Sequence, residues 1–296
     1  MGNRLHNKKK IKWGQILLNL FLIIICLCFI LPMVLLVSVS LSGENFLNFK
    51  FIPESLSLFA YEMVFQNPKQ IIDAYSVTIF YSLSTVVLAM ITMSLMAYAL
   101  SRPNFKLRKG ITFMLFFSVL FGSGMVPTYI VVSGMLNLDN TIWVYILPNL
   151  VNCWSVIVMR TFFVNLPNEL FESARIDGAS EVRLCFQMAI PLSTPILATN
   201  AYQIFLSSWN DWGTSSIYMR KPELFSLQYV LQRFMQSAEL SQQLMNQGGI
   251  AVSEAAGNVE VVRFAMAVMG VGPAILFFPF IQKYYDKGLI VGSVKG

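Results

Sequence analysis

Long apolar runs, separated by short polar segments, dominate the sequence from residue 13 onward. An α-helix rises about 1.5 Å per residue, so about 20 mostly apolar residues are needed to cross the roughly 30 Å of hydrocarbon in a bilayer. Six runs meet this requirement. The pattern therefore predicts six membrane-spanning helices, at residues 13–40, 74–101, 111–133, 141–163, 195–217 and 262–281.

The polar segments define the rest of the organisation. Residues 13–281 form one predicted transmembrane domain of an all-α, polytopic membrane protein. The segments outside the spans include a basic tail at 1–12, a charged loop at 164–194, a long loop at 218–261 and a tail at 282–296. The 218–261 loop has the pattern of an amphipathic helix, a turn at Asn246–Gly249 and a second short helix, which is typical either of contact with an external partner or of a connecting loop.

Composition agrees with a membrane location. Of 296 residues, 56% are apolar and 12% are charged. Most Lys and Arg residues fall in the segments on the side of the two termini, and cytoplasmic loops carry the excess of positive charge in membrane proteins. Both termini are therefore expected in the cytoplasm. This placement explains the net charge of +6 without nucleic acid.

The first apolar run and the four cysteines each allow a second interpretation. The first apolar run is longer than a signal-peptide core and no small-residue cleavage site follows it, which favours a retained helix. Cys26, Cys28, Cys153 and Cys185 lie in apolar surroundings or near the cytoplasmic face, where disulfides are not expected. His6, the only histidine, lies in the basic tail, so the residue set predicts no metal site.

The charged loop contains the segment "FESARIDGASEVRLCFQMAIPL" at 171–192. Asn168 can cap a short helix with acidic residues in its first turn, and Gly178 can take the left-handed position that ends it. Ser180 can cap a second helix that continues to Pro191. Leu170, Phe171 and Ala174 share one face, and an isolated helix this short is marginal in water, so it needs a surface on which to pack.

These residues resemble the "EAA" loop of ABC-importer permeases, whose usual form is E-A-A-x-x-x-G-x9-I-x-L-P. Glu172, Gly178 and Pro191 stand in register, while Ser173, Met188 and Ile190 replace the usual Ala, Ile and Leu. The resemblance implies the type I ABC-importer permease fold, with this loop as a coupling helix seated in an ATPase subunit. The ATPase-coupling residues it implies are Glu172, Ser173, Ala174, Arg175, Asp177 and Gly178.

The ending "QKYYDKGLIVGSVKG" at 282–296 resembles the C-terminal tail of the maltose-type, carbohydrate-importing permeases, and "SSWNDWGTSSIYM" is similar to that subgroup as well. The likeness implies a second ATPase contact at Lys287, Gly288, Lys295 and Gly296, although such a tail can also be solvated and without function. It implies transport of a sugar or oligosaccharide by alternating access. The implied partners are a second permease with six spans, two copies of a P-loop ATPase and an extracytoplasmic solute-binding protein, all working in membrane lipid.

The chain contains no G-x-x-x-x-G-K-[ST] phosphate-binding motif. It is therefore expected to be a transport subunit without enzymatic activity and without a cofactor of its own, with ATP and Mg on the separate ATPase.

Polar residues inside spans mark the expected substrate path, because such residues are costly in a bilayer unless they have a function. The candidates are Asn152, Asn200, Gln203, Trp209, Asn210 and Asp211. Trp209 and Trp212 have the composition of a sugar-stacking pair, but equally that of an aromatic belt at the membrane interface or of simple packing.

Three other functions are open to a polytopic membrane protein. An ABC permease for a peptide, phosphonate or amino acid would share the coupling loop, but the tail favours the carbohydrate subgroup. A gradient-driven transporter or channel would be expected to carry ionisable groups at mid-membrane or inverted repeats, and the central parts of these spans have essentially no ionisable group. A membrane enzyme would need a cluster of catalytic side chains, and no such cluster is evident.

Overall fold

The computed structural model describes residues 13–43, 53, 55–247, 261–279 and 282, and these residues are almost entirely helical. The described chain divides into two compact units, one of residues 1–66 with 238–269 and the other of residues 67–237 with 270–296. Among the described residues the only extended pairing is an isolated antiparallel bridge between Ser42 and Leu56. The predicted all-α membrane architecture is confirmed.

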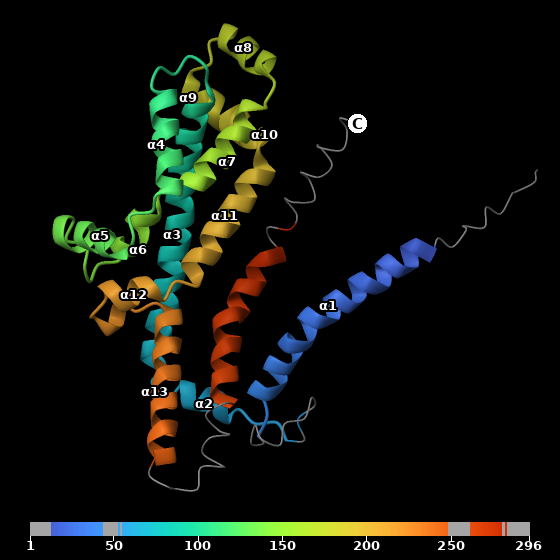
Figure 1. Cartoon of the computed structure of the whole chain (residues 1–296), viewed down its shortest axis with the longest axis vertical. Coiled ribbons are helices and arrows are strands. Elements are labelled where there is room, and N and C mark those ends of the chain that lie inside the picture. Colours follow the sequence, from blue (N-terminus) through green and yellow to red (C-terminus); the bar gives the residue numbers. More distant parts are fainter. Residues whose placement is uncertain (1–12, 44–52, 54, 248–260, 280–281, 283–296) are drawn as a thin grey trace, which may run out of the picture. The chain divides into compact units, whose positions relative to one another are not determined.

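Figure 1 shows the order of the described helices along the chain. The α-helices are α1 Trp13–Ser40, α2 Phe59–Val64, α3 Pro68–Ser101, α4 Arg108–Leu120, α5 Met125–Tyr129, α6 Trp143–Ile146, α7 Cys153–Val164, α8 Asn168–Ile176, α9 Glu181–Leu184, α10 Ile190–Leu192, α11 Thr194–Trp209, α12 Gly213–Tyr218, α13 Leu227–Gln247 and a further helix Val261–Pro279. Two π-helical segments, Ile130–Met135 and Cys185–Ala189, and two 3-10 turns, Leu147–Asn149 and Pro222–Leu224, complete the described structure.

Three continuous helices among the described residues are long and apolar enough to cross a membrane: Gly14–Ser40, Pro68–Ser101 and Val261–Pro279. Two further candidates are bent pairs. Trp143–Asn149 meets Cys153–Val164 at 45°, and Glu181–Leu192 meets Thr194–Trp209 at 86°. The predicted third span, 111–133, is divided between α4, α5 and the first π-helical segment. Gly124, with φ +80°, lies between α4 and α5. The number and limits of the spans stay a prediction.

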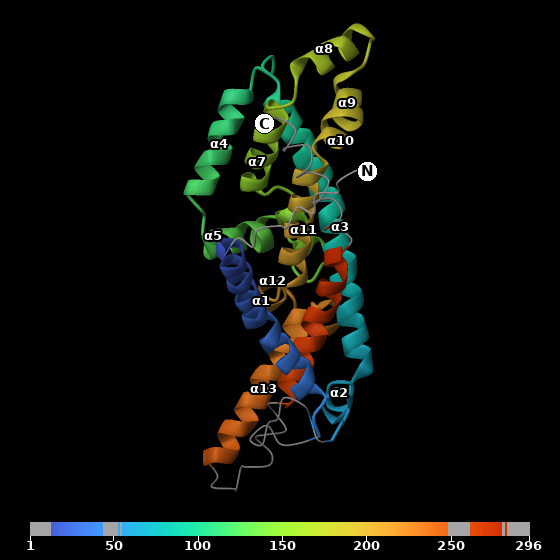
Figure 2. The same ribbon diagram turned by 90° about the vertical axis from the view of Figure 1, so that its right-hand side faces the viewer.

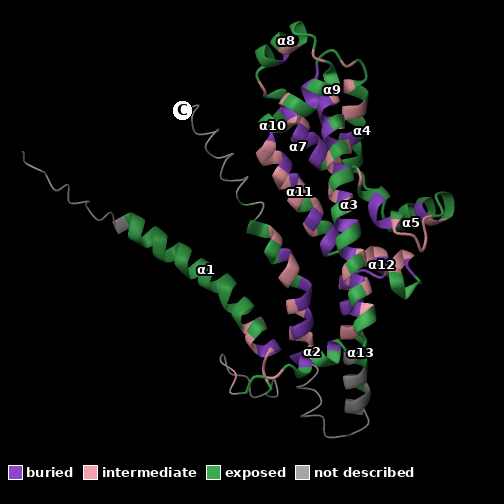
Figure 3. Ribbon diagram, turned by 180° about the vertical axis from the view of Figure 1, so that it is seen from behind, coloured by how far each residue is buried: buried purple, intermediate pink, exposed green. Residues whose placement is uncertain are grey.

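In the first unit, the end of α1 packs against α2 and the start of the helix Val261–Pro279. Val39, Ala60, Val261 and Ala265 form this small buried cluster. The Ser40 and Tyr61 hydroxyls lie 2.9 Å apart and share a hydrogen bond. Most of α1 before this point is apolar and exposed (Figure 3), which is typical of a helix covered by lipid or by another membrane subunit.

In the second unit, α3 packs along α7 and α11, and the three helices lie side by side in both views (Figures 1 and 2). Small side chains recur on the buried face of α3, and small residues let helix backbones approach closely in a membrane. The buried small residues of this face are Ala74, Thr78, Ser82, Thr85, Ala89 and Ala97. The main core of the unit lies between α3, α7, α9 and α11 and also includes Phe171 of α8. The short helix α8 is thus attached to the transmembrane core.

Candidate functional site

The helix α8 has well-defined ends that follow from its sequence. Pro167 is extended and occupies the N-cap, so the helix begins at Asn168. The expected cap at Asn168 is therefore wrong by one residue, because the extended turn of the chain falls on proline. At the other end, Gly178 is left-handed with φ +83°, as predicted. The Gly178 N–H donates to the Arg175 carbonyl and the Ala179 N–H to the Ala174 carbonyl, each at 3.0 Å, which is the Schellman arrangement.

The next helix also begins as predicted. Ser180 is its N-cap, and the Ser180 hydroxyl accepts a hydrogen bond from the Arg183 N–H at 3.3 Å. The sequence of caps from Pro167 to Ser180 therefore fixes a helix, a tight turn and a second helix within a few residues.

The inner face of α8 is held by an aromatic and cationic cluster. Phe171 is fully buried, and the guanidinium of Arg102, just beyond α3, lies 4.2 Å from the centroid of its ring. The same guanidinium lies 4.6 Å from the ring centroid of Tyr98. Arg102 also donates to the Ser101 hydroxyl at 3.0 Å and to the Phe163 carbonyl at 3.4 Å. Arg102 therefore joins α8 to the ends of α3 and α7.

A second connection runs through Glu181 at the start of α9. Arg175 donates to one oxygen of the Glu181 carboxylate at 2.8 Å, and the Tyr98 hydroxyl donates to the other oxygen at 2.7 Å. The hydrogen bond to this carboxylate raises the pKa of Arg175. Because both oxygens of Glu181 are used, the carboxylate ties α8, α9 and α3 together.

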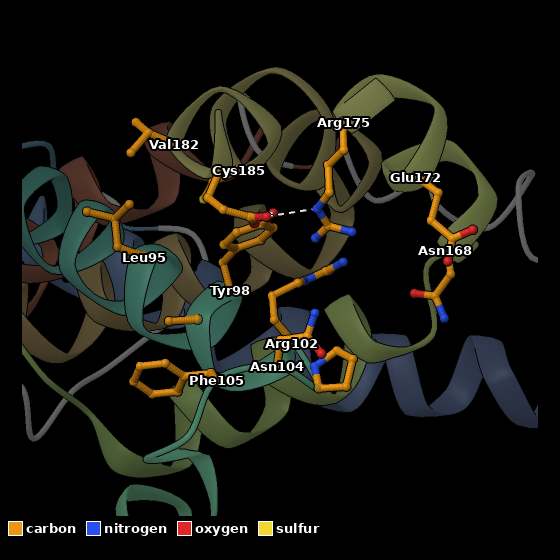
Figure 4. Close-up of a pocket in the computed structure, with 13 residues that line it drawn as sticks. Leu95, Tyr98, Arg102, Asn104, Phe105, Asn168, Glu172, Arg175, Val182 and Cys185 are labelled. Carbon is orange, nitrogen blue, oxygen red and sulfur yellow. Dashed lines mark hydrogen bonds and ion pairs between the residues drawn. The ribbon is translucent and has the colours of Figure 1, made fainter. Parts of the chain in front are cut away.

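A cavity of about 620 Å³ lies beneath α8 and is lined by residues of α3, α8 and α9 and by the turn after α3. Glu172, Arg175 and Arg102 line it (Figure 4). The outer side of α8 is open to solvent, and Ile176 is 86% exposed. This apolar side chain stands at the end of a helix that is held firmly by its inner face.

The structure separates the predicted coupling residues into two groups. Glu172, Ser173 and Asp177 are exposed on α8 or just after it, and Gly178 makes the turn. Ala174 is half-buried and packs on the core, and Arg175 is exposed but already paired with Glu181. Lys287, Gly288, Lys295 and Gly296 lie outside the described residues.

A second cavity, of about 540 Å³, lies between α7 and the last part of α11. Its volume is in the range of small-molecule binding sites. Polar side chains dominate its lining. The lining residues are Pro148, Asn149, Val151, Asn152, Ser155, Gln203, Ile204, Ser207, Ser208, Asp211 and Thr214.

Two short stretches position these polar groups. Gln203, Ser207 and Asp211 recur every four residues and so lie on one face of α11 and the turn that follows it. Asn152 caps α7, accepting a hydrogen bond from the Ser155 N–H at 2.9 Å. Asp211 lies one residue before Trp212, the N-cap of α12, and its side chain accepts a hydrogen bond from the Thr214 N–H at 3.0 Å. These hydrogen bonds hold both side chains at the edge of the cavity.

Comparison with known proteins places the chain in a family. No family model matches it. It is 33% identical over 279 residues to the polygalacturonan/rhamnogalacturonan transport system permease protein YtcP of Bacillus subtilis, covering 93% of this chain and 96% of that protein. The chain belongs to the family of carbohydrate ABC transport permeases. Protein LplC of the same organism is 33% identical over 270 residues, 90% of each chain.

A solved structure supports the same assignment. A chain of a bacterial ABC transporter involved in the import of the acidic polysaccharide alginate matches this carbohydrate permease with a TM-score of 0.77 and 28% identity, covering 92% of this chain and 96% of that chain. The fold is therefore that of a type I ABC-importer permease. The chain is a multi-pass membrane protein of this class.

The permease brings three of the six predicted substrate-path residues into one cavity: Asn152, Gln203 and Asp211. The other three do not line it. Asn200 and Asn210 donate side-chain hydrogen bonds to carbonyls one turn earlier in α11, at 2.9 and 2.8 Å. Trp209 is buried, stacks on Phe205 and donates from its indole nitrogen to the Gly270 carbonyl at 2.8 Å, so its ring is engaged in packing.

Sequence reasoning missed the hydroxyl side chains that line the cavity: Ser155, Ser207, Ser208 and Thr214. For Ser207 a signal was available, because Gln203, Ser207 and Asp211 are spaced four residues apart. It also missed the Tyr98, Arg102 and Glu181 cluster, for which no local signal exists, because these residues meet only when α3 and α9 pack. Among the described residues, no group of three or more His, Cys, Asp or Glu side chains could hold a metal ion.

The packing of Trp209 leads to a first prediction. A Trp209→Phe variant should lose thermal stability in detergent by an amount equivalent to about 1 kcal/mol, the usual net value of a hydrogen bond. Its apparent KM for transport should stay unchanged. Gln203→Leu is the matched control, since it removes a cavity-lining amide and should raise KM with little change in stability. A large rise in KM for the Trp209 variant would assign its ring to the substrate path.

Proposed function

We propose that this permease moves a sugar or oligosaccharide across the bacterial cytoplasmic membrane by alternating access, driven by a separate ATPase that docks on α8. The observation that carries the proposal is the arrangement of α8. The helix is held from behind by Phe171, Arg102 and Glu181. It exposes Ile176 on its outer side, and Glu172, which borders the cavity beneath the helix, is exposed as well. A short rigid lever of this kind can pass a movement of the ATPase to α3, to which it is tied.

The charge distribution supports a cytoplasmic position for α8. Within the second unit, the end that carries α8 holds more basic residues than the opposite end, and positive charge is concentrated in cytoplasmic loops. The basic residues near this end are Arg102, Lys106, Arg108, Lys109, Arg160, Arg175 and Arg183. Both chain termini are accordingly proposed to be cytoplasmic.

The polar cavity supports a sugar as the substrate. Amide and hydroxyl side chains offer both donors and acceptors, which match the hydroxyl groups of a carbohydrate. The names of the similar permeases, for maltodextrin and arabinooligosaccharide transport among others, agree with this class of substrate.

The complete transporter would contain a second permease, two copies of a P-loop ATPase that bind ATP and Mg, and an extracytoplasmic solute-binding protein. The exposed apolar surface of α1 would be covered by lipid or by the second permease. In this proposal Lys287, Gly288, Lys295 and Gly296 of the C-terminal tail make a further contact with the ATPase.

The proposal is tested by purifying the tagged permease from its native membrane and identifying the proteins that accompany it. Labelled oligosaccharide uptake is measured in parallel in cells with and without the chain. Recovery of a second permease and a P-loop ATPase, together with uptake that depends on the chain, is the expected result. A homo-oligomer without an ATPase would overturn the coupling proposal, and the absence of any chain-dependent sugar uptake would overturn the substrate class.

The turn at Gly178 gives a second prediction. Gly178→Val should lower both ATPase recovery and sugar uptake, because β-branched residues are strongly disfavoured at φ +83°. Nothing lies within 4 Å of a Cβ added at this position, so the effect comes from the backbone and not from a clash. Gly178→Asn is the matched control, since asparagine tolerates left-handed backbone and should behave nearly as the wild type. Equal loss in both variants would contradict this role of the turn.

A further inference from the structure

We infer that this permease carries neutral glycans and discriminates against acidic ones, and that Asp211 is the residue that sets this preference. The inference rests on the proposed sugar import and adds the charge class of the sugar. It concerns the cavity between α7 and α11, where Asp211 lies.

The only charged residue that lines this cavity among the described residues is Asp211, which is negative. Its polar side chains are three amides, from Asn149, Asn152 and Gln203, several hydroxyls and the carboxylate of Asp211. None of the lining residues is Lys, Arg or His. A cavity that selects carboxylated sugars would be expected to present a guanidinium or ammonium group, because charge-assisted hydrogen bonds are the strong ones for a carboxylate.

Gln203, Ser207 and Asp211 form a polar stripe along α11 and the turn after it, called here the α11 stripe, and their side chains are available to a ligand. Gln203 and Ser207 are exposed, and neither side chain makes a hydrogen bond to another described residue. Asp211 is half-buried, and one of its oxygens accepts from the Thr214 N–H at 3.0 Å. A carboxylate has about four acceptor positions, so further positions remain for the hydroxyl groups of a sugar. Neutral glycans thus find acceptors and donors along the whole stripe.

An acidic glycan meets the opposite situation. The carboxylate of a uronic acid residue would enter a cavity that holds Asp211 and no cation of this chain, and like charges at short range repel, more strongly away from bulk water. Repulsive elements of this kind are a common source of specificity. The importer of similar structure takes an acidic polysaccharide, and the similar permease YtcP is named for polygalacturonan and rhamnogalacturonan, which also carry uronic acid carboxylates. The Asp211 carboxylate and the absence of a cation among the lining residues argue that the likeness in sequence and fold does not extend to the charge of the substrate.

The test compares uptake of neutral and acidic oligosaccharides by cells that make the complete transporter. The panel consists of neutral di- to tetrasaccharides and of matched counterparts that carry a hexuronate residue. Uptake is measured with wild-type chain, with Asp211→Asn and with Asp73→Asn. Asn keeps an oxygen that can accept from the Thr214 N–H, so the hydrogen bond at the start of α12 is preserved. Asp73 lies outside the cavity, so its replacement is the matched control for charge.

Wild-type cells should take up neutral members and discriminate against the hexuronates. Asp211→Asn should raise the ratio of hexuronate to neutral uptake by on the order of tenfold, from the loss of like-charge repulsion. Asp73→Asn should leave the ratio unchanged. The same solute-binding protein is present in all three strains, so a change in ratio reports on the permease.

Two results would overturn the inference while leaving sugar import standing: efficient hexuronate uptake by the wild type, or an unchanged ratio in Asp211→Asn. Chain-dependent uptake of no sugar at all would instead overturn the proposed function, and this inference with it.

Discussion

A permease carrying both Glu172→Ala and Ile176→Ser should insert and fold normally but recover little ATPase and lose ATP-driven sugar uptake. Ile176 is 86% exposed, so its replacement removes almost no packing within the chain. Burying such a side chain in a partner is worth roughly 1.5–3 kcal/mol, and Glu172 offers a charge for pairing beside it. Co-purification of the ATPase and uptake in proteoliposomes, each relative to wild type, measure the effect.

The matched control for this double variant is Glu223→Ala with Leu240→Ser. Both residues are exposed and lie outside α8, in the segment from residue 218 to 247. The control should recover the ATPase at the wild-type level. Normal ATPase recovery by the Glu172 and Ile176 variant would remove the outer side of α8 from the docking surface.

Replacing Arg102 by Ala should give the second large effect. This variant should keep the ATPase bound but should couple ATP hydrolysis poorly to sugar transport. The outer side of α8 is unchanged, so the ATPase should still bind and hydrolyse ATP. The contact of Arg102 with two rings, worth about 2 kcal/mol or more where it is shielded from water, is lost together with its hydrogen bonds. We expect the helix to loosen on its support and the sugar transported per ATP hydrolysed to fall about tenfold or more, since about 1.4 kcal/mol corresponds to a factor of ten.

Two further variants separate this effect from a general loss of charge. Arg160→Ala removes another arginine, whose Nε donates to the Leu100 carbonyl at 3.1 Å, but Arg160 makes none of the contacts that hold α8. The amount of sugar that the Arg160→Ala variant transports per ATP hydrolysed should stay near the wild-type value. Arg102→Lys keeps the charge without the planar group and should be intermediate. Wild-type coupling in Arg102→Ala would show that the anchor of α8 does not transmit movement.

Local features of the coupling segment could be predicted because they depend on backbone preferences of single residues. Gly178 takes the left-handed position and Ser180 caps α9, and both follow from the residue type and its neighbours. The start of α8 was misplaced by one residue because Pro167 and Asn168 are adjacent, and each is compatible with a helix start. The functional roles assigned to the residues of this segment remain predictions.

The substrate path could be predicted only in part. Polarity within a span identified Asn152, Gln203 and Asp211, which line the cavity. It equally identified Asn200 and Asn210, whose side chains donate hydrogen bonds to backbone carbonyls of their own helix. Successive residues of a helix point about 100° apart. A helix of known position therefore still has an unknown rotation, and rotation decides whether a polar side chain faces a cavity.

The sequence by itself determined that the chain is an all-α membrane protein, because uninterrupted apolar length requires a bilayer and a bilayer requires helices. It also determined the turn at Gly178, and its motif indicated the permease family. Only the tertiary structure brought Tyr98, Arg102, Phe171 and Glu181 together. These residues come from segments up to 83 positions apart, and no local preference links them. Their contacts arise when α3, α8 and α9 pack, which depends on shape and burial summed over the whole core.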